Sequence, residues 1–345
     1  MRSVQVTASR NYEVHIGSGL LPSIADHVAA MKKVRSVCIV SDTNVWPLYG
    51  KTVENALIQR KLNIVSFVFE AGEASKNPET YLDLLSFLSE NRLTRTDLII
   101  ALGGGVVGDL AGFAAATYLR GIPYIQVPTT LLAAVDSSVG GKTAIDLPAG
   151  KNLVGAFYQP ALVLCDIDCL DTLPEDVFRD GCAEVIKYGI LYDEALFSHL
   201  TEHGLGFDRE LVITRCVELK RDVVSQDEYD TGARMKLNLG HTIGHGVEAL
   251  SNFSVRHGEA VAIGMAIVAR SSCDETTKDS IISVLKQFHL PVSTVYSAGE
   301  LAECAMSDKK RTGGTVNLII PDRIGFCRIE ATSVEKIQSF IEAGL

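Results

Sequence analysis

The sequence predicts an α/β, Rossmann-like amino-terminal domain with a mainly parallel sheet, followed by a mostly helical domain. Up to about residue 172, short β-rich runs alternate with segments that carry apolar residues at helical spacing, which is typical of βαβ units. Beyond that point little strand pattern occurs until two runs near the carboxyl end. We therefore place the boundary between an α/β domain over 1–172 and a mostly helical domain over 173–345.

The elements follow from the positions of the apolar runs. Val4–Ala8 and Tyr12–Ile16 are expected to form an antiparallel pair of strands. Helical spacing of the apolar residues within 81–88 is one example of the segments between strands. A Leu-Pro-Glu-Asp turn at 173–176 opens the helical part. The remaining strands are expected at 36–42, 63–69, 97–102, 124–128, 161–167, 315–321 and 324–330.

Composition excludes several classes of protein. The chain has 345 residues, of which 47% are hydrophobic and 21% charged, so it can bury enough surface to fold and is not disordered. No uncharged run reaches the length of a membrane span, and the amino terminus has no apolar segment typical of a signal peptide. A formal charge of −10 argues against nucleic acid as a partner. The eight cysteines form no CxxC pair and have apolar neighbours, so we expect reduced core thiols and a cytoplasmic location.

A glycine-rich turn lies at 103–109, directly after the strand expected at 97–102 and before a helical run at 110–120. Its glycines match G-x-G-x-x-G, which suits the pyrophosphate of a dinucleotide; the alternative is a turn that packs the helix on the strand. A Rossmann fingerprint requires an acidic residue about 20 positions downstream, and this sequence has none there. The candidate for the ribose is instead Asp42, which ends an earlier strand and is followed by Asn44; the alternative is a capping role for Asp42.

Arg234, Asn238, His241 and His245 recur at helical spacing, so we expect one polar stripe on a helix. Such a stripe between apolar flanks is costly to bury without a ligand or a metal ion. The alternative for each residue alone is an ordinary hydrogen-bonded side chain.

Two further residues add to a possible metal centre. His257 opens a helical segment over 258–270, and Glu184 lies three residues before Lys187, hence on the same helix face. One carboxylate and two imidazoles would hold Zn²⁺ with one position open for substrate.

Cations also occur in loops rich in glycine. Lys142 ends the segment 136–142, Lys151 and Asn152 follow Gly150, and Arg120 ends the helix after the glycine turn. These groups would suit an anionic ligand, although solvated loop lysines are the alternative.

Taken together, these segments resemble the 3-dehydroquinate synthases, a family of the sugar-phosphate cyclases. The resemblance extends from about Asp42 to Gly325. The matching segments are GEASKN (72–77), GGGVVGDLAGF (103–113), YLRGI (118–122), VPTTLLAAVDSSVGGKTAID (127–146), GKNLVGAFYQP (150–160), AEVIKYG (183–189), LNLGHTIGHGVE (237–248), HGEAVAIGM (257–265) and DKK (308–310).

The resemblance implies a dehydroquinate synthase-like fold, an NAD-binding first domain and a homodimer. It implies a carbon–oxygen lyase that converts the sugar phosphate 3-deoxy-D-arabino-heptulosonate 7-phosphate to 3-dehydroquinate and phosphate in the shikimate pathway. NAD would be used catalytically, together with Zn²⁺ or Co²⁺.

The family's functional residues carry over onto matching positions. Glu184, His241 and His257 would bind the metal. NAD would be held by Asp42, Asn44, Glu73, Lys76, Gly104, Gly105, Val106, Val107, Gly108, Asp109, Thr129, Thr130, Lys142, Lys151, Cys169, Leu170, Asp171 and Thr172. Substrate contacts or catalytic roles would fall on Arg120, Asp136, Lys142, Asn152, Lys187, Lys220, Arg234, Asn238, His245, Lys309 and Lys310.

Two of these positions have more specific implied roles, and Asp230 is a further catalytic candidate. His245 is the candidate for proton transfer. Arg120 resembles an arginine that reaches the partner subunit's site. Asp230 stands where the family usually has Glu, which places an acid–base role for that position in doubt.

Other functions stay open at this point. Another sugar-phosphate cyclase would keep the NAD and metal motifs but change the contacts to the substrate carboxylate. A metal- and NAD-dependent alcohol dehydrogenase would share the architecture but would not need the residues Lys142, Lys151 and Asn152. A non-catalytic NAD-binding protein would not need the set of Glu184, His241 and His257.

Overall fold

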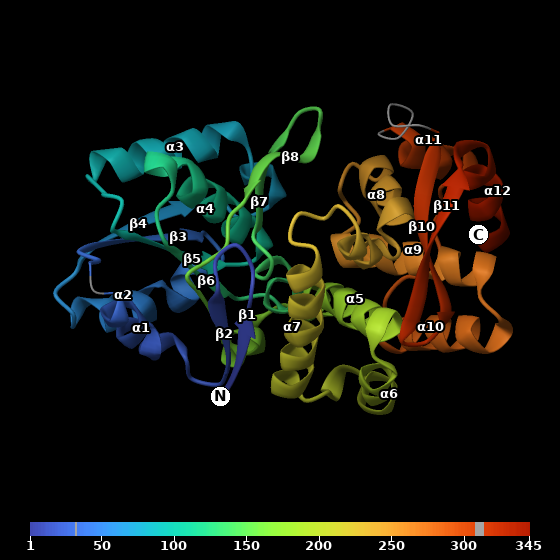
Figure 1. Cartoon of the computed structure of the whole chain (residues 1–345), viewed down its shortest axis with the longest axis horizontal. Coiled ribbons are helices and arrows are strands. Elements are labelled where there is room, and N and C mark those ends of the chain that lie inside the picture. Colours follow the sequence, from blue (N-terminus) through green and yellow to red (C-terminus); the bar gives the residue numbers. More distant parts are fainter. Residues whose placement is uncertain (32, 308–313) are drawn as a thin grey trace. The chain divides into compact units, whose positions relative to one another are not determined.

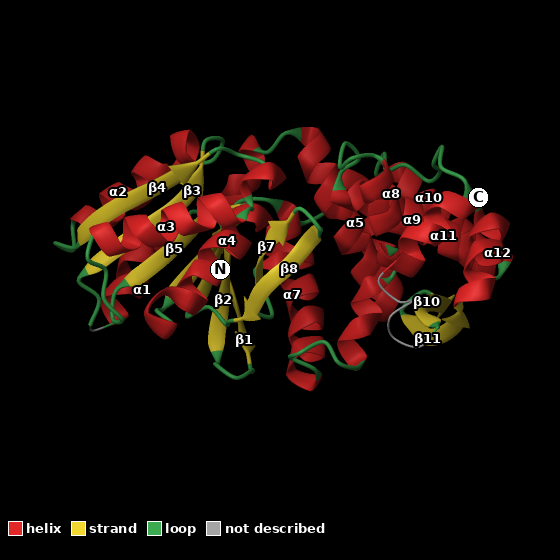
Figure 2. Ribbon diagram, turned by 90° about the horizontal axis from the view of Figure 1, so that it is seen from above, coloured by secondary structure: helices red, strands yellow, loops and turns green. Residues whose placement is uncertain are grey.

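The computed structural model describes residues 1–31, 33–307 and 314–345. The chain forms two compact units, one of Met1–Leu173 with Arg209–Tyr229 and one of Pro174–Asp208 with Asp230–Leu345. The main sheet belongs to the first unit, and helices dominate the second (Figure 2). This confirms the expected fold class.

The first unit is built on a seven-stranded sheet in the order β1-β2-β9-β6-β5-β3-β4. The first two strands pair antiparallel, as expected, and all other neighbours pair parallel. Residues Leu98–Gly103 of β5 are all buried, which is typical of a central strand with both faces covered. The strands are β1 (Arg2–Val6), β2 (Tyr12–Gly17), β3 (Ser36–Asp42), β4 (Asn63–Phe69), β5 (Leu98–Gly103), β6 (Tyr124–Pro128) and β9 (Leu162–Asp166).

Helices cover both faces of this sheet (Figure 1). On one face, α3 (Pro78–Glu90) and α4 (Gly105–Thr117) bury leucines and valines against β3, β4 and β5. On the other, α1 (Ile24–Ala30) and α2 (Lys51–Ile58) pack against the same strands. Asn77 caps α3 by accepting a hydrogen bond from the Thr80 N–H, and Pro78 occupies its first turn.

The segments that we expected to be glycine-rich loops instead form an antiparallel hairpin outside the main sheet. Its strands are β7 (Lys142–Leu147) and β8 (Gly150–Phe157) (Figure 1). The glycines hid this hairpin, because strands rarely contain them, but Gly155 has main-chain and side-chain atoms of β7 where a Cβ would lie. Lys142, Lys151 and Asn152 are therefore held on strands.

Helix α7 (Arg209–Gln226) departs from the expected division of the chain. We expected all residues after 172 to form the second domain, but α7 packs in the first unit against β1, β2 and the π-helical turn Ala133–Ser137. Long-range packing decides this position, which helical periodicity alone does not encode.

The second unit contains seven α-helices and one hairpin among its described residues. The helices are α5 (Glu175–Tyr192), α6 (Glu194–His203), α8 (His241–Leu250), α9 (His257–Ser272), α10 (Glu275–Gln287), α11 (Ala298–Ser307) and α12 (Val334–Gly344). The hairpin pairs β10 (Thr315–Arg323) with β11 (Phe326–Ser333). Within the described part of the chain, no helix combines the length and apolar character that crossing a membrane requires.

The prediction of a single helix across 234–245 is wrong. Ala233–Asn238 forms a 3₁₀ helix, and α8 starts separately at His241. Between them Gly240 adopts a left-handed conformation with φ of 78°, which redirects the chain.

Candidate active site

The glycine turn and Asp42 lie at the carboxyl ends of the neighbouring strands β5 and β3. The chain runs from β3 outward to β4 and then returns to β5 on the other side, so the strand order reverses between β3 and β5. Ligands of open α/β sheets bind at such a switch point. Here the glycine turn starts at the last residue of β5, and Asp42 is the last residue of β3. The acidic residue therefore precedes the glycines in the chain, which explains why none lies about 20 positions downstream of them.

The glycine turn leads directly into α4. Its cap residue, Gly104, is the one residue between β5 and α4 and has no side chain to bond the first N–H groups of the helix. Open N–H groups and the positive end of a helix dipole suit a phosphate or pyrophosphate.

Asp42 has a local role as well. Its Oδ1 accepts hydrogen bonds from the N–H groups of Asn44, at 2.9 Å, and Val45, at 2.8 Å. Asp42 therefore has the capping role that was the alternative to ribose binding, but both hydrogen bonds go to the same oxygen, Oδ1. The same carboxylate can hold the turn and present Oδ2 to a ligand hydroxyl.

An ion-pair network around the buried Lys76 lies beside the glycine turn. Lys76 Nζ is 2.7 Å from Asp109 Oδ2 and 3.7 Å from Glu73 Oε1, while Lys151 Nζ is 3.8 Å from the same Glu73 oxygen. Burial alone would lower the pKa of Lys76, but the carboxylates of Asp109 and Glu73 raise it above its usual value. Lys76 is therefore a fixed cation in the first unit.

Thr129 and Thr130 follow β6, the next strand in the sheet. Thr130 Oγ1 accepts a hydrogen bond from the Ala133 N–H. Thr129 Oγ1 is buried and has no hydrogen-bond partner among the described residues. A buried hydroxyl without a partner is unfavourable, so it suggests a ligand atom at this position.

The remaining predicted cofactor residues, Cys169 to Thr172, form a 3₁₀ helix after β9. The Tyr49 hydroxyl donates to the Cys169 carbonyl at 3.1 Å and contacts Thr172 Oγ1. Tyr49 holds this turn in place, and no motif in the sequence pointed to it.

The tip of the β7–β8 hairpin is held by another residue that sequence reasoning missed. Asp146 Oδ1 accepts a hydrogen bond from the Asn152 N–H at 2.7 Å, and Asp146 N–H donates to the Lys76 carbonyl at 2.7 Å. Asn152 takes a left-handed φ of 56°, which this bond helps to support. Asp146 thereby links the Lys76 segment to the hairpin.

Two predicted substrate residues form a pair within the first unit. Lys220 on α7 donates to the Asp136 carbonyl at 2.6 Å and to Asp136 Oδ1 at 2.8 Å. The pair fastens α7 to the turn that precedes the hairpin.

The second unit brings Glu184, His241 and His257 together from three helices. Glu184 Oε1 is 3.4 Å from His241 Nε2 and 3.6 Å from His257 Nε2. Four ligands at about 2.1 Å from a tetrahedral Zn²⁺ lie about 3.4 Å apart, so these atoms fit the spacing of a metal centre. Lys187 forms an ion pair with the other oxygen of Glu184, as their shared helix face predicted.

Both histidines direct Nε2 toward Glu184 and Nδ1 toward an acceptor. His241 Nδ1 is 3.0 Å from the Leu239 carbonyl, and His257 Nδ1 is 3.4 Å from Glu248 Oε2. Burial, and then the Lys187 cation, hold the pKa of His241 well below its usual value. Burial alone would also lower the pKa of His257, but hydrogen bonds to Glu184 and Glu248 raise it to about 10. A metal ion would therefore displace a proton from His257.

Two glycines allow the three helices to approach closely enough. A Cβ on Gly258 of α9 would lie 1.9 Å from the Asp180 carbonyl oxygen of α5, and one on Gly264 would lie 2.0 Å from the Gly240 carbonyl before α8. Asp180 Oδ1 also accepts a hydrogen bond from the Glu259 N–H, which caps the start of α9. The metal-like cluster thus depends on contacts that only glycine permits.

The other predicted residues of the second unit differ in burial. Arg234 is buried, whereas Asn238 and His245 are exposed. Asp230 has a left-handed φ of 58°, a conformation that Asp tolerates better than most residues. Lys309 and Lys310 lie outside the described residues. In the first unit, Arg120 is exposed in a turn with a positive φ.

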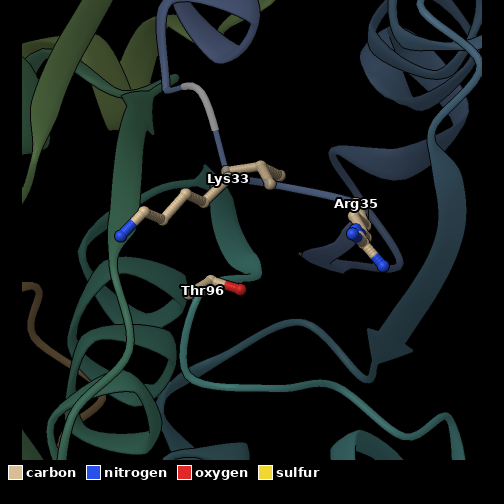
Figure 3. Close-up of a pocket in the computed structure, with 4 residues that line it drawn as sticks. Lys33, Arg35 and Thr96 are labelled. Atoms are coloured by element: carbon tan, nitrogen blue, oxygen red, sulfur yellow. The ribbon is translucent and has the colours of Figure 1, made fainter.

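A pocket of about 320 Å³ is lined by Lys33, Val34, Arg35 and Thr96 (Figure 3). Its residues precede β3 and β5, at the amino ends of those strands. Asp42 and the glycine turn lie at the carboxyl ends, so this pocket is separate from the candidate cofactor site.

Family models describe most of the chain. The model for the amino-terminal part of 3-dehydroquinate synthase matches residues 66–180, and the model for the carboxyl-terminal part matches 181–311. The 3-dehydroquinate synthase of Pelobacter propionicus is 45% identical over 341 residues, which is 95% of each chain. That of Clostridium acetobutylicum is 41% identical over 99% of each chain.

Solved structures of sugar-phosphate cyclases are also similar to this chain. A 2-deoxy-scyllo-inosose synthase complexed with carbaglucose-6-phosphate, NAD⁺ and Co²⁺ has a TM-score of 0.90 at 25% identity, with 100% of both chains covered. A 2-epi-5-epi-valiolone synthase from Streptomyces hygroscopicus with NAD⁺ and Zn²⁺ has a TM-score of 0.88 at 26% identity, covering 99% of this chain and 98% of that one. A glycerol dehydrogenase from Schizosaccharomyces pombe shares the fold, with a TM-score of 0.68 at 17% identity, over 98% of this chain and 91% of that one.

Proposed function

This chain belongs to the 3-dehydroquinate synthase family, and on that premise we propose that it converts 3-deoxy-D-arabino-heptulosonate 7-phosphate to 3-dehydroquinate and phosphate. The observation that carries the proposal is the convergence of Glu184, His241 and His257, which lie on three helices of a chain 39–45% identical to several 3-dehydroquinate synthases. The enzyme is a carbon–oxygen lyase, and its reaction belongs to the shikimate pathway.

The proposed cofactors are NAD and one divalent metal ion, Zn²⁺ or Co²⁺. When bound, NAD takes up and returns a hydride, and the metal acidifies the alcohol that is oxidised. In the first unit, the open start of α4, the carboxylate of Asp42 and the buried Thr129 hydroxyl fit a dinucleotide. In the second unit, the spacing of Glu184 and the two histidines fits the metal.

The chain's own residues would bind the substrate and move protons. Arg234 presents a guanidinium that can bind the substrate carboxylate through two hydrogen bonds. Lys142, Asn152 and Arg120 supply a cation, an amide and a guanidinium for the phosphate that leaves. His245 is the candidate for proton transfer, because an imidazole titrates near neutrality.

The units have separate tasks in this proposal. The unit of Met1–Leu173 with α7 binds NAD, and the unit of Pro174–Asp208 with Asp230–Leu345 binds the metal. We also propose a homodimer in which the exposed Arg120 reaches the partner's site. Six of the eight cysteines are buried thiols, which supports a reducing compartment such as the cytoplasm.

The test follows phosphate and NADH absorbance in one cuvette with the heptulosonate phosphate as substrate. We expect one phosphate per turnover, many turnovers per NAD⁺ and no lasting NADH absorbance, because the electrons return before product is released. The product should have the mass of 3-dehydroquinate. Steady accumulation of one NADH per product without phosphate would contradict the proposal and favour an alcohol dehydrogenase, whereas no reaction of this substrate would favour another cyclase.

A further inference from the structure

Glu248 is a buried carboxylate that no part of the proposed reaction uses. It lies on α8, one turn after His245 and two turns after His241, and is 3% exposed. Its Oε2 is 3.4 Å from His257 Nδ1 and 4.0 Å from His245 Nε2. A carboxylate is seldom buried unless a partner compensates its charge, so this placement calls for an explanation.

The two nitrogens of His257 have different surroundings. Nε2 is 3.6 Å from Glu184 Oε1, where the metal cluster converges, and Nδ1 faces Glu248. A histidine can bind a metal only through an unprotonated nitrogen. An acceptor at Nδ1 keeps the proton of the neutral ring there and leaves the Nε2 lone pair directed to the cluster.

His241 provides an internal comparison. Its Nδ1 donates to the Leu239 main-chain carbonyl, so its orientation is set by a neutral acceptor close in sequence. At His257 the acceptor for Nδ1 is instead a charged side chain, Glu248, which lies on a different helix. A charged acceptor at this position can affect both the orientation of the ring and the charge of the centre, where the Lys187 cation already pairs with Glu184.

We propose that Glu248 is a positioning residue, which orients His257 for metal binding through Nδ1 and supplies a compensating negative charge. This inference rests on the proposed metal centre and adds a residue to it. Loss of such an outer partner lowers metal affinity by about 10- to 100-fold in other metal sites.

The test compares Glu248→Gln and Glu248→Leu with wild type and with Glu275→Gln, which removes an exposed carboxylate of α10. Gln keeps an acceptor without the charge, and Leu keeps most of the volume without either. The dissociation constants for Zn²⁺ and Co²⁺ are measured on the metal-free full chain by chelator competition. Circular dichroism and the melting temperature of the metal-free forms check folding.

We expect metal binding to weaken about tenfold in Glu248→Gln and up to about 100-fold in Glu248→Leu, with an altered visible spectrum of the Co²⁺ form and no change in Glu275→Gln. If the leucine variant does not fold, the glutamine variant decides the matter. Affinity within twofold of wild type in the folded variants would overturn the inference. Two metal equivalents in wild type, one of which is lost with Glu248, would make Glu248 a direct ligand and would also overturn it. Failure of the wild-type chain to bind metal would instead refute the metal centre itself.

Discussion

Replacing Gly258 by Ala should separate the elements that form the metal cluster. The added Cβ would lie 1.9 Å from the Asp180 carbonyl oxygen and 2.8 Å from Asp180 Oδ1, and main chain does not yield as a flexible side chain does. Relief of the contact requires α5 and α9 to move apart by about 1 Å. Glu184 lies one turn beyond Asp180 on α5, and His257 is the first residue of α9.

The displacement is large compared with the tolerance of a metal site. Glu184 Oε1 and His257 Nε2 are 3.6 Å apart, close to the spacing of about 3.4 Å between tetrahedral ligands. A shift of about 1 Å raises this to about 4.6 Å, beyond the reach of one ion. We therefore expect metal affinity to fall at least about 100-fold, and the free energy of unfolding of the metal-free chain to fall by about 1–3 kcal/mol.

The assay is titration of the metal-free variant with Zn²⁺ or Co²⁺ against a chelator, together with urea unfolding. Gly206→Ala is the matched control, because nothing lies within 4 Å of the position of its added Cβ. It should bind metal as wild type does. Wild-type metal affinity in Gly258→Ala would refute the reasoning, since it would mean that the contact between α5 and α9 does not set the ligand spacing.

Three further predictions concern protonation, stability and substrate recognition. Glu184 and Glu248 raise the pKa of His257 to about 10, so its proton must leave when a metal ion binds. The affinity for Zn²⁺ should therefore rise about tenfold per pH unit between pH 6 and 8, with release of a proton. A metal affinity that does not depend on pH would contradict this. Lys220→Ala should lower the free energy of unfolding by about 2 kcal/mol, because Asp136, whose side chain is 25% exposed, loses its buried partner. Urea unfolding measures this loss, and Arg221→Ala, which removes a more exposed ion pair with Asp222, is the control. An equal loss of stability in both variants would count against the prediction. Arg234→Lys should lower kcat/KM about 100-fold, because lysine lacks the two-pronged donor geometry, and steady-state kinetics at wild-type level would assign Arg234 another role.

Much of the first unit could be predicted because its signals are local. Apolar runs bounded by turns mark the strands, and the position of Asp42 at the carboxyl end of one of them made it a candidate ligand residue. That this strand neighbours the one that ends in glycines is known only from the sheet. The failures occurred where local patterns compete with packing. Glycines concealed the β7–β8 hairpin, and the left-handed Gly240 divided a segment whose spacing predicted one helix.

The sequence alone determined the class of fold, the identity of the family and the residue types available for a metal ion, because these depend on periodicity and on motifs that are contiguous in the chain. Tertiary structure decided what those motifs form together. It joined Glu184 to histidines more than 50 positions away, turned Nε2 of both rings toward its carboxylate, and brought Glu248 to the far side of His257. It also packed α7 into the first unit, where Lys220 pairs with Asp136. The physical reason is that a helix or strand forms through interactions between residues close in sequence. Side chains from distant helices come together only where those helices can pack closely, and here Gly258 and Gly264 permit that close packing.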